Sequence, residues 1–451
     1  MKYKDTILTG RELALTALTA IEEKEAFANR TLNSLFLKYR PDERERGFAT
    51  ELVYGTLRHL ALVDHLLAQL LAKPLSALSG KIRNILRLSL YQLLVSPEIA
   101  YAVVDEGVGL AKKEAGGKLA GLVTAVLRRY LREKETLSRP QMAADPLRHL
   151  TIAHSHPEWL VKRWVRRWGI QRVHELVRVN NLPAPFMIRT NTLRITRDRL
   201  QVLLASSGLT AIPSPLTPEA LLITAPRNLQ DNSLFAAGYY FIQDEASMLV
   251  AHLVAPQPGE TIVDLCAAPG GKTTHLAQLM EDEGRIFALD NHPHKTRLIK
   301  ENAARLGITS ITALTADARE WRGNDLEPDV VLLDAPCTGT GVLRRRPDIR
   351  WRRTAADLSH LVLLQEELLE NAASMLKPGG RLIYSTCSLE AEEDEEQVER
   401  FLRKHPEFSV EIEADFASGF DLIRSSTGLL LFPSENGADG FFMSKLRKRS
   451  K

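Results

Sequence analysis

Hydrophobic positions in the first third of the chain recur at the three- and four-residue spacing of α-helices. One such stripe consists of Leu119, Leu122, Val123, Val126, Leu127 and Tyr130, and another of Ile82, Ile85, Leu86, Leu93 and Leu94. Glycine and proline separate the periodic segments, at Pro74, Gly80 and Gly116-Gly117. Residues 1–140 are therefore predicted to form an all-α bundle with basic exposed faces.

Residues 145–240 show a mixed pattern. A helix is predicted to begin near Pro157-Glu158, because proline suits the first helical position. The segment 183–192, which contains Arg189-Thr190-Asn191, is predicted to be extended. We expect a small, basic α/β unit here.

Strands and helices are predicted to alternate from residue 241 to 451. Short apolar runs predict strands at 261–266, 285–290, 311–316, 329–334 and 381–386. Helical stretches are predicted around 272–280, 293–306 and 354–376. Such alternation is typical of an α/β fold in which helices cover both faces of a parallel sheet. The last apolar run, residues 440–444, is predicted to add an antiparallel edge strand.

The composition is that of a globular protein with two or three domains. Of the 451 residues, 44% are hydrophobic and 25% are charged. We expect no membrane association, because no apolar stretch approaches about 18 residues without a charge. Met1–Asp5 precedes no signal-type apolar core, so we expect a cytoplasmic protein. Three cysteines without C-x-x-C spacing argue against a disulfide framework and against a metal site.

Charge is distributed unevenly along the chain. Residues 1–240 hold 34 Lys and Arg against 22 Asp and Glu, a net +12, whereas residues 241–451 hold 25 against 34, a net −9. A basic front half is typical of a nucleic-acid-binding protein. Solvated helix faces of mixed sign are the alternative interpretation.

Two of the three cysteines follow predicted strands. Cys337 closes the run Asp334-Ala335-Pro336-Cys337, and Cys387 lies in Tyr384-Ser385-Thr386-Cys387-Ser388. Ligands in open α/β sheets bind at the carboxyl ends of the strands. The two thiols are therefore candidates for chemistry, although a small buried residue at a strand end is the alternative for each.

A glycine-rich turn follows the strand predicted at 261–266, and it consists of Cys266, Ala267, Ala268, Pro269, Gly270, Gly271 and Lys272. Such a turn lets backbone N–H groups approach a ligand closely. A Walker A loop would need glycine where Cys266 stands, and the dinucleotide motif G-x-G-x-x-G is absent, so an ATPase or a dehydrogenase fits poorly.

Acidic residues end the next two predicted strands. Asp290 lies 19 residues after Gly271, close to the position of a carboxylate that binds ribose hydroxyls. Asp317 is a candidate for the adenine amino group. A ligand with ribose and adenine but no phosphate is S-adenosylmethionine. The alternative is that both aspartates cap the helices that follow.

The quoted motifs resemble those of the RNA cytosine-carbon-5 methyltransferases. They are Asp264–Thr273, Asp334–Gly341 and Ser385–Ser388. The front of the chain, with Leu52–Arg58 and Gly121–Arg129, resembles a NusB-type RNA-binding domain. Together they resemble the RsmB/Sun/Fmu 16S ribosomal RNA methyltransferases over essentially the whole chain. The resemblance implies a NusB-like domain at 1–140 and a small RNA-binding α/β subdomain at 145–240. It also implies a class I methyltransferase fold at 241–451, which is Rossmann-like with a mostly parallel seven-stranded sheet.

The resemblance also implies roles for residues. Cys387 would attack carbon 6 of the cytosine, and Cys337 would assist breakdown of the adduct. DNA cytosine methyltransferases use the Pro-Cys position for the attack, so the sequence alone does not order the two thiols. Asp334 is expected to face the cofactor or the base, and Lys272 is expected to help polarise the base.

The implied partner is 16S rRNA, and the family site is cytosine 967. We expect this cytosine to be single-stranded or flipped out, because an RNA helix would hide the base. We expect a monomer that acts on naked RNA or on a partial small subunit. Arg344–Arg353, which includes Trp351, is predicted to contact phosphates and stack on bases. Two alternatives stay open: the same chemistry on another RNA such as tRNA, and a non-catalytic RNA-binding factor.

Overall fold

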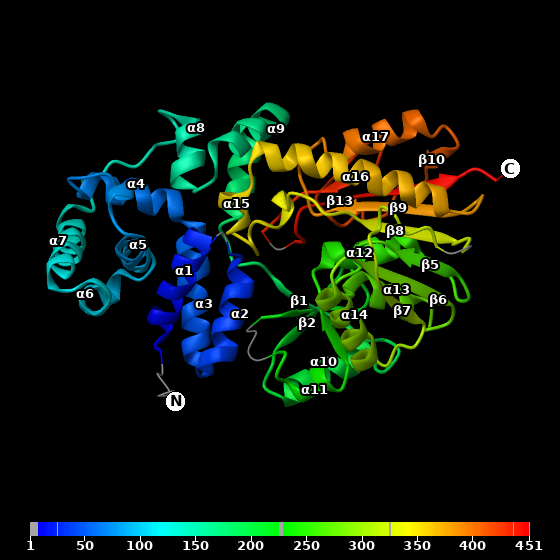
Figure 1. The fold of residues 1–451 in the computed structure, drawn as a ribbon, viewed down its shortest axis with the longest axis horizontal. Helices are drawn as coiled ribbons and strands as arrows, with labels where there is room; N and C mark the ends of the chain where they lie inside the picture. The colour runs from blue at the N-terminus through cyan, green and yellow to red at the C-terminus, as the bar shows by residue number, and fades with distance from the viewer. Residues whose placement is uncertain (1–7, 25, 225–228, 324–325, 436, 451) are drawn as a thin grey trace. The chain divides into compact units, whose positions relative to one another are not determined.

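The computed structural model describes residues 8–24, 26–224, 229–323, 326–435 and 437–450, so Met1–Asp5 lies outside the described residues. The chain forms two compact units (Figure 1). The first comprises the residues up to Leu182 together with Leu343–Arg352. The second comprises Pro183–Val342 and the residues from Arg353 onward. Residues 145–182, predicted to begin a separate domain, thus belong to the compact helical unit.

The first unit is helical, as the periodic stripes predict. Its helices are α1 Gly10–Lys24, α2 Ala28–Tyr39, α3 Glu43–Arg58, α4 Leu60–Leu70, α5 Gly80–Val95, α6 Ala100–Ala115, α7 Gly117–Glu133, α8 Pro146–Arg148, α9 Glu158–Val179 and α15 Ile349–Arg352. Both predicted stripes supply the core, in which Ile82, Ile85, Val123 and Leu127 are fully buried. A π-helical turn, His149–Ala153, follows α8, and α9 bends at Gly169, whose φ is 76°.

The segment Leu343–Arg352 leaves the second unit and packs within the helical unit. Arg344 and Arg350 are only 2% and 1% exposed. The Arg350 guanidinium donates to the carbonyl oxygens of Arg58, Ser155 and Asn180 and to Oδ1 of Asn181, at 2.9–3.2 Å. The indole Nε1 of Trp351 donates to the carbonyl of Leu57 at 2.7 Å. The predicted phosphate contacts are therefore wrong for Arg344 and Arg350, which are buried inside the fold. Trp351 is partly buried, and its predicted stacking on bases stays a prediction.

We expect Arg350→Ala to lower the free energy of unfolding of the helical unit by about 3 kcal/mol, because it leaves four acceptors without this donor in a buried site. Urea denaturation followed by hydrogen exchange of residues 343–352 measures this. Arg346→Ala, at an exposed arginine of the same segment, should change stability by less than about 0.5 kcal/mol. Equal effects of the two substitutions would contradict the anchoring role.

The second unit contains a small and a large sheet. The small antiparallel sheet has the order β2-β3-β1-β4. Its elements are β1 Phe186–Thr190, α10 Arg197–Ser206, β2 Ala211–Pro213, β3 Ala220–Ile223, α11 Ser233–Ala236 and β4 Tyr240–Ile242. The extended segment predicted at 183–192 is confirmed by β1.

The large sheet contains the parallel core expected of a class I methyltransferase. Its elements are α12 Glu245–Val254, β5 Thr261–Asp264, α13 Gly271–Leu279, β6 Arg285–Asp290, α14 Pro293–Leu306, β7 Ile311–Thr315, β8 Val330–Asp334, α16 Ala355–Met375, β9 Arg381–Thr386, α17 Glu395–Lys404, β10 Phe408–Val410, β11 Leu422–Arg424, β12 Leu429–Leu431 and β13 Phe441–Lys448. Strands β9-β8-β5-β6-β7 are parallel, and the five predicted strands are confirmed. Figure 1 shows α16 and α17 on one side of this sheet and α12 on the other.

The antiparallel end of the sheet is larger than predicted. Strand β13 pairs with β9 but also with β10 and β12, so it lies inside the sheet and the predicted edge position is wrong. With β10 and β11 added, the described sheet has nine strands instead of seven. The reason is that β13 is eight residues long. One of its edges pairs with β9, and the backbone groups of its other edge pair with β12 and β10. None of the helices in the described ranges has the length and apolarity that a bilayer crossing requires.

Candidate active site

Adjacent parallel strands bring the two predicted cysteines together. Asp334, the last residue of β8, lies opposite Ser385 of β9. Cys337 and Cys387 follow these strand ends, and their Sγ atoms are 3.3 Å apart. Both are free thiols. The structure thus places two thiols within contact distance at the carboxyl edge of the sheet, where ligands bind in open α/β folds.

The two thiols are in different environments from Cys266. The hydrogen bond with Cys387, followed by burial, raises the pKa of Cys337 well above its ordinary value. Burial also raises the pKa of Cys266, which follows β5. The shift favours the neutral thiol form of Cys337, and either sulfur of the pair can donate the hydrogen bond between them.

A buried carboxylate, Glu393, connects the loops that carry the two cysteines. Its Oε1 accepts from the backbone N–H of Thr338 at 2.8 Å, and its Oε2 accepts from the hydroxyls of Thr338 and Ser388, each at 2.5 Å. Gln365 donates to Oε1 at 3.0 Å and to the carbonyl of Pro336 at 2.9 Å. Thr338 follows Cys337 and Ser388 follows Cys387, so one side chain fixes both loops.

The sequence interpretation missed Glu393, since an acidic run at the start of a helix is favourable on its own and needs no further role. Glu393 lies just before α17 and is 0% exposed. Burial raises the pKa of this carboxyl despite its donors. Its place in the site becomes visible only from its hydrogen-bond partners, which are Thr338 and Ser388 in the two cysteine loops and Gln365 in α16.

Backbone contacts tighten the same region. The N–H of Gly341 donates to the carbonyl of Cys387, and the N–H of Gly440 donates to the carbonyl of Gly341, each at 2.9 Å. A Cβ at Gly341 would lie 2.1 Å from the carbonyl oxygen of Gly440, so only glycine fits there. Arg353 donates to the carbonyls of Cys337 and Thr338 at 3.2 and 3.1 Å. This residue of the predicted RNA-contact segment therefore supports the Cys337 loop.

Lys272 and Asp334 form an ion pair beside the thiols. Nζ of Lys272 lies 2.7 Å from Oδ2 of Asp334, while Oδ1 accepts from the hydroxyl of Ser385 at 2.9 Å. The ammonium also lies 4.9 Å from the centre of the Phe441 ring. This pair links the glycine-rich turn to the ends of β8 and β9.

The glycine-rich turn lies between β5 and α13, as predicted. Gly270 takes the left-handed conformation, with φ 99°, at the start of α13. Arg189, in β1, is 1% exposed and donates to the carbonyl of Gly271 at 2.6 Å and to Oγ1 of Thr274 at 2.9 Å. The sequence interpretation left Arg189 without a role, although a lone arginine inside an apolar strand is a signal of a buried contact.

Acidic side chains surround this turn. Asp290 ends β6, is 7% exposed and lies 3.3 Å from Nζ of Lys295. Asp317, two residues after β7, is paired with Arg319 at 2.6 Å. Burial raises the pKa of Asp264 to about 7, and its Oδ2 accepts from Thr273 at 2.7 Å. These carboxylates can accept hydrogen bonds from a ribose diol and suit a ligand with a positive sulfonium centre. The turn provides close backbone approach without a phosphate-binding motif.

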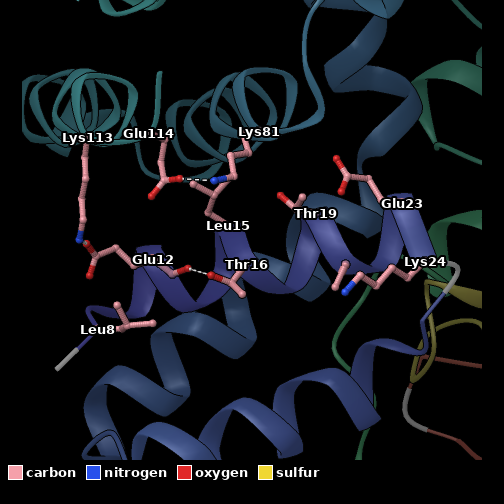
Figure 2. A pocket seen from close by; sticks show the side chains of 11 residues that line it. Leu8, Glu12, Leu15, Thr16, Thr19, Glu23, Lys24, Lys81, Lys113 and Glu114 are labelled. Atoms are coloured by element: carbon pink, nitrogen blue, oxygen red, sulfur yellow. Dashed lines mark hydrogen bonds and ion pairs between the residues drawn. The ribbon is translucent and has the colours of Figure 1, made fainter. Parts of the chain in front are cut away.

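A separate groove of about 340 Å³ lies on the helical unit (Figure 2). Its charged lining residues are Glu12, Glu23, Lys24, Lys81, Lys113 and Glu114. Lys81 pairs with Glu114 at 2.6 Å, and Lys113 pairs with Glu12. This groove differs from the site at the sheet edge in two ways. Its lysines pair with glutamates of its own lining, and no cysteine lines it.

Comparison with known proteins gives three family matches along the chain. A family model described as 16S rRNA methyltransferase RsmB/F matches residues 251–447. The NusB family matches residues 9–132. A ferredoxin-like domain of RsmF/B-like methyltransferases matches residues 156–230.

Full-length relatives agree with these matches. The probable ribosomal RNA small subunit methyltransferase B of Bacillus subtilis is 36% identical over 445 residues, which cover 97% of this chain and 98% of that protein. The ribosomal RNA small subunit methyltransferase B of Vibrio cholerae is 34% identical, with 98% of each chain covered. The crystal structure of NSun6 from Pyrococcus horikoshii with SFG, an analogue of S-adenosylmethionine, has a TM-score of 0.59 and 26% identity, covering 65% of this chain and 99% of that one.

Proposed function

This chain belongs to the 16S rRNA methyltransferase RsmB/F family, and from that premise we propose that it methylates carbon 5 of a cytosine in 16S rRNA, with the family's cytosine 967 as the target. The observation that carries the proposal is the 3.3 Å separation of the Cys337 and Cys387 thiols at the sheet edge. A lone thiol could be structural, but two at this distance beside an ion pair suit covalent catalysis with assisted release.

S-adenosylmethionine is the cofactor of this methyltransferase, and when bound it supplies an electrophilic methyl group. The residues proposed to hold it are the turn from Cys266 to Lys272, with Asp290 at the ribose and Asp317 at the adenine. Lys272, at the end of this turn, is paired with Asp334, which stands at the strand end before Cys337.

Cys387 is proposed to act first. Its thiolate would form an Sγ–C6 bond, and the C5–C6 π electrons would make carbon 5 nucleophilic. Carbon 5 would then accept the methyl group that the bound cofactor supplies. A base then removes the proton from carbon 5, the C5–C6 double bond re-forms, and Sγ leaves as a thiolate. The step balances when the base takes this proton, since one methyl group enters carbon 5 and one proton leaves it.

The order of the two thiols rests on the resemblance of the Asp334–Gly341 and Ser385–Ser388 motifs to those of the RNA cytosine-carbon-5 methyltransferases. The pKa of Cys337 is raised by its hydrogen bond to Cys387 and by burial, so Cys337 retains its proton. From that resemblance, Cys387 is proposed as the nucleophile, and Cys337 as the group that assists release of the product.

The proposed substrate is cytosine in a single-stranded or flipped-out conformation, acted on by a monomer in the cytoplasm. The purified protein with S-adenosylmethionine should be incubated with naked 16S rRNA, with partial small subunits and with tRNA, followed by bisulfite sequencing. We expect one protected cytosine, at 967, in 16S rRNA or in the partial subunit. Protection of a tRNA cytosine instead would show that the proposed substrate is wrong, while the proposed methylation of cytosine carbon 5 would stand.

We expect Asp290→Asn to weaken S-adenosylmethionine binding about 10-fold, because an amide loses the charge-assisted hydrogen bonds that a carboxylate makes to ribose hydroxyls. Asparagine can still accept from the N–H of His292, which Asp290 does at 3.2 Å, so the local turn is kept. Calorimetric titration measures the Kd. Glu301→Gln, at an exposed carboxylate on α14, is the matched control. Unchanged affinity with a lower melting temperature would identify Asp290 as only a capping residue.

A further inference from the structure

Three histidines of the helical unit lie close together, and none of them is among the residues assigned to the catalytic edge. His149 opens the π-helical turn, His154 follows that turn, and His174 lies in α9 beyond its bend at Gly169. One nitrogen of each ring lies within 4.8 Å of the others. π-Helical turns are rare and are frequently found at functional sites. Spacings of 5 and 20 residues form no known metal motif, which is why the sequence did not predict a site here.

The ring arrangement matches a common metal ion. The ring centres are 5.0 Å apart for His149–His154 and His154–His174, and 5.6 Å apart for His149–His174. Three imidazoles bound to one tetrahedral zinc ion, with Zn–N bonds of about 2.0–2.1 Å, have ring centres about 5 Å apart. The rings are only partly buried, so small rotations can bring the nitrogens together and water can supply a fourth ligand.

His149 is already oriented for metal binding. Its Nδ1 lies 2.8 Å from the carbonyl oxygen of Pro140, and only a donor nitrogen can make that bond. The Nε2 atom therefore carries the free lone pair. Imidazoles that bind metals typically donate their other N–H to a carbonyl or carboxylate in this way.

The nearby charge does not oppose a cation strongly. Arg178 lies one turn beyond His174 on α9, and its guanidinium is paired with Glu175 at 2.6 Å. By contrast, a second cluster, Glu219 with His252 and His275, lacks room for an ion. There the carboxylate oxygen lies 2.9 and 2.6 Å from the two imidazole nitrogens, so it occupies the central position itself.

We propose that His149, His154 and His174 bind one zinc ion, which connects the π-helical turn to the second half of α9. These elements are adjacent in sequence to Ser155, Asn180 and Asn181, which accept hydrogen bonds from Arg350. The ion would therefore stabilise the part of the helical unit that holds the segment Leu343–Arg352. The role is structural, because the proposed site contains none of the groups assigned to methyl transfer.

The test uses the full-length, untagged protein after removal of metal with a chelator. We expect one zinc ion per chain by calorimetry and elemental analysis, and a cobalt(II) form with the visible absorption of tetrahedral coordination. His174→Ala should weaken zinc binding at least 100-fold. Removing a residue that hydrogen-bonds to a metal ligand typically lowers metal affinity 10–100-fold, and removing the ligand itself should cost more. His252→Ala, in the second cluster, should bind zinc like the parent chain.

Hydrogen exchange provides a readout that does not depend on enzymatic activity. Zinc should slow exchange in residues 343–352 of the parent chain and of His252→Ala, but not of His174→Ala. Metal-free parent and His174→Ala proteins should have equal melting temperatures, which separates loss of the ligand from loss of the fold. Equal zinc affinity in His174→Ala and the parent, or loss of zinc in His252→Ala alone, would overturn the proposal.

Discussion

Cys387→Ala is expected to abolish both methyl transfer and covalent capture of RNA, whereas Cys337→Ala is expected to accumulate a stable protein–RNA adduct. The first substitution removes the sulfur that forms the bond to carbon 6, so no enamine-like ring can form. The second leaves that sulfur in place but removes the neighbouring thiol, 3.3 Å away, that assists release. Removing a catalytic nucleophile typically lowers the rate by several orders of magnitude.

Denaturing gel electrophoresis of protein mixed with 16S rRNA and S-adenosylmethionine measures the adduct, and transfer of a labelled methyl group measures turnover. The double variant Cys337→Ala/Cys387→Ala is the control, and it should form no adduct, because trapping requires Cys387. An adduct on Cys387→Ala alone would reverse the roles of the two thiols. Full turnover by either single variant would show that the pair is structural.

Glu393→Ala is expected to lower the rate of methyl transfer about 100-fold, equivalent to about 2.7 kcal/mol, without changing the Kd for S-adenosylmethionine. The carboxylate accepts from Thr338, Ser388 and Gln365, so its removal leaves buried donors without partners and frees both cysteine loops. Each loop carries one thiol, and a shift of about 1 Å at reacting groups can cost about 100-fold.

The design separates positioning from folding. Glu393→Gln keeps one acceptor oxygen and the side-chain volume, so it should recover part of the lost rate. Glu396→Ala removes a carboxylate at the start of α17 that is 50% exposed and lies 3.8 Å from Arg400, and it should leave the rate unchanged. Adduct formation by Cys337→Ala should slow when Glu393→Ala is added. A Glu393→Ala protein with full activity, or one that also loses cofactor binding, would contradict this role.

Local patterns in the sequence were sufficient for the catalytic sheet. Strands β5 to β9 are short apolar runs with turns between them, and β5, β8 and β9 are buried along nearly their whole length, which makes such runs recognisable without tertiary information. The glycine-rich turn and the two cysteines could be located because parallel strands end at one edge. The order of the thiols came from family resemblance and not from this pattern.

Predictions failed where a residue's environment is made by distant segments. An arginine run is typical of a solvated, RNA-binding surface, yet Arg350 is buried by carbonyls of Arg58, Ser155 and Asn180, far away along the chain. Strand β13 was expected at an edge because nothing in its own residues announces the partners β10 and β12.

The sequence by itself determined the periodicity of the helical unit, the parallel strands and which residues stand at the strand ends, because these depend on side-chain spacing and backbone preference over a few residues. Only the tertiary structure decided that the two thiols touch, that Glu393 connects their loops and that Arg350 lies inside the fold. Those facts depend on the distance and hydrogen-bonding of groups far apart in the chain, which local pattern does not encode.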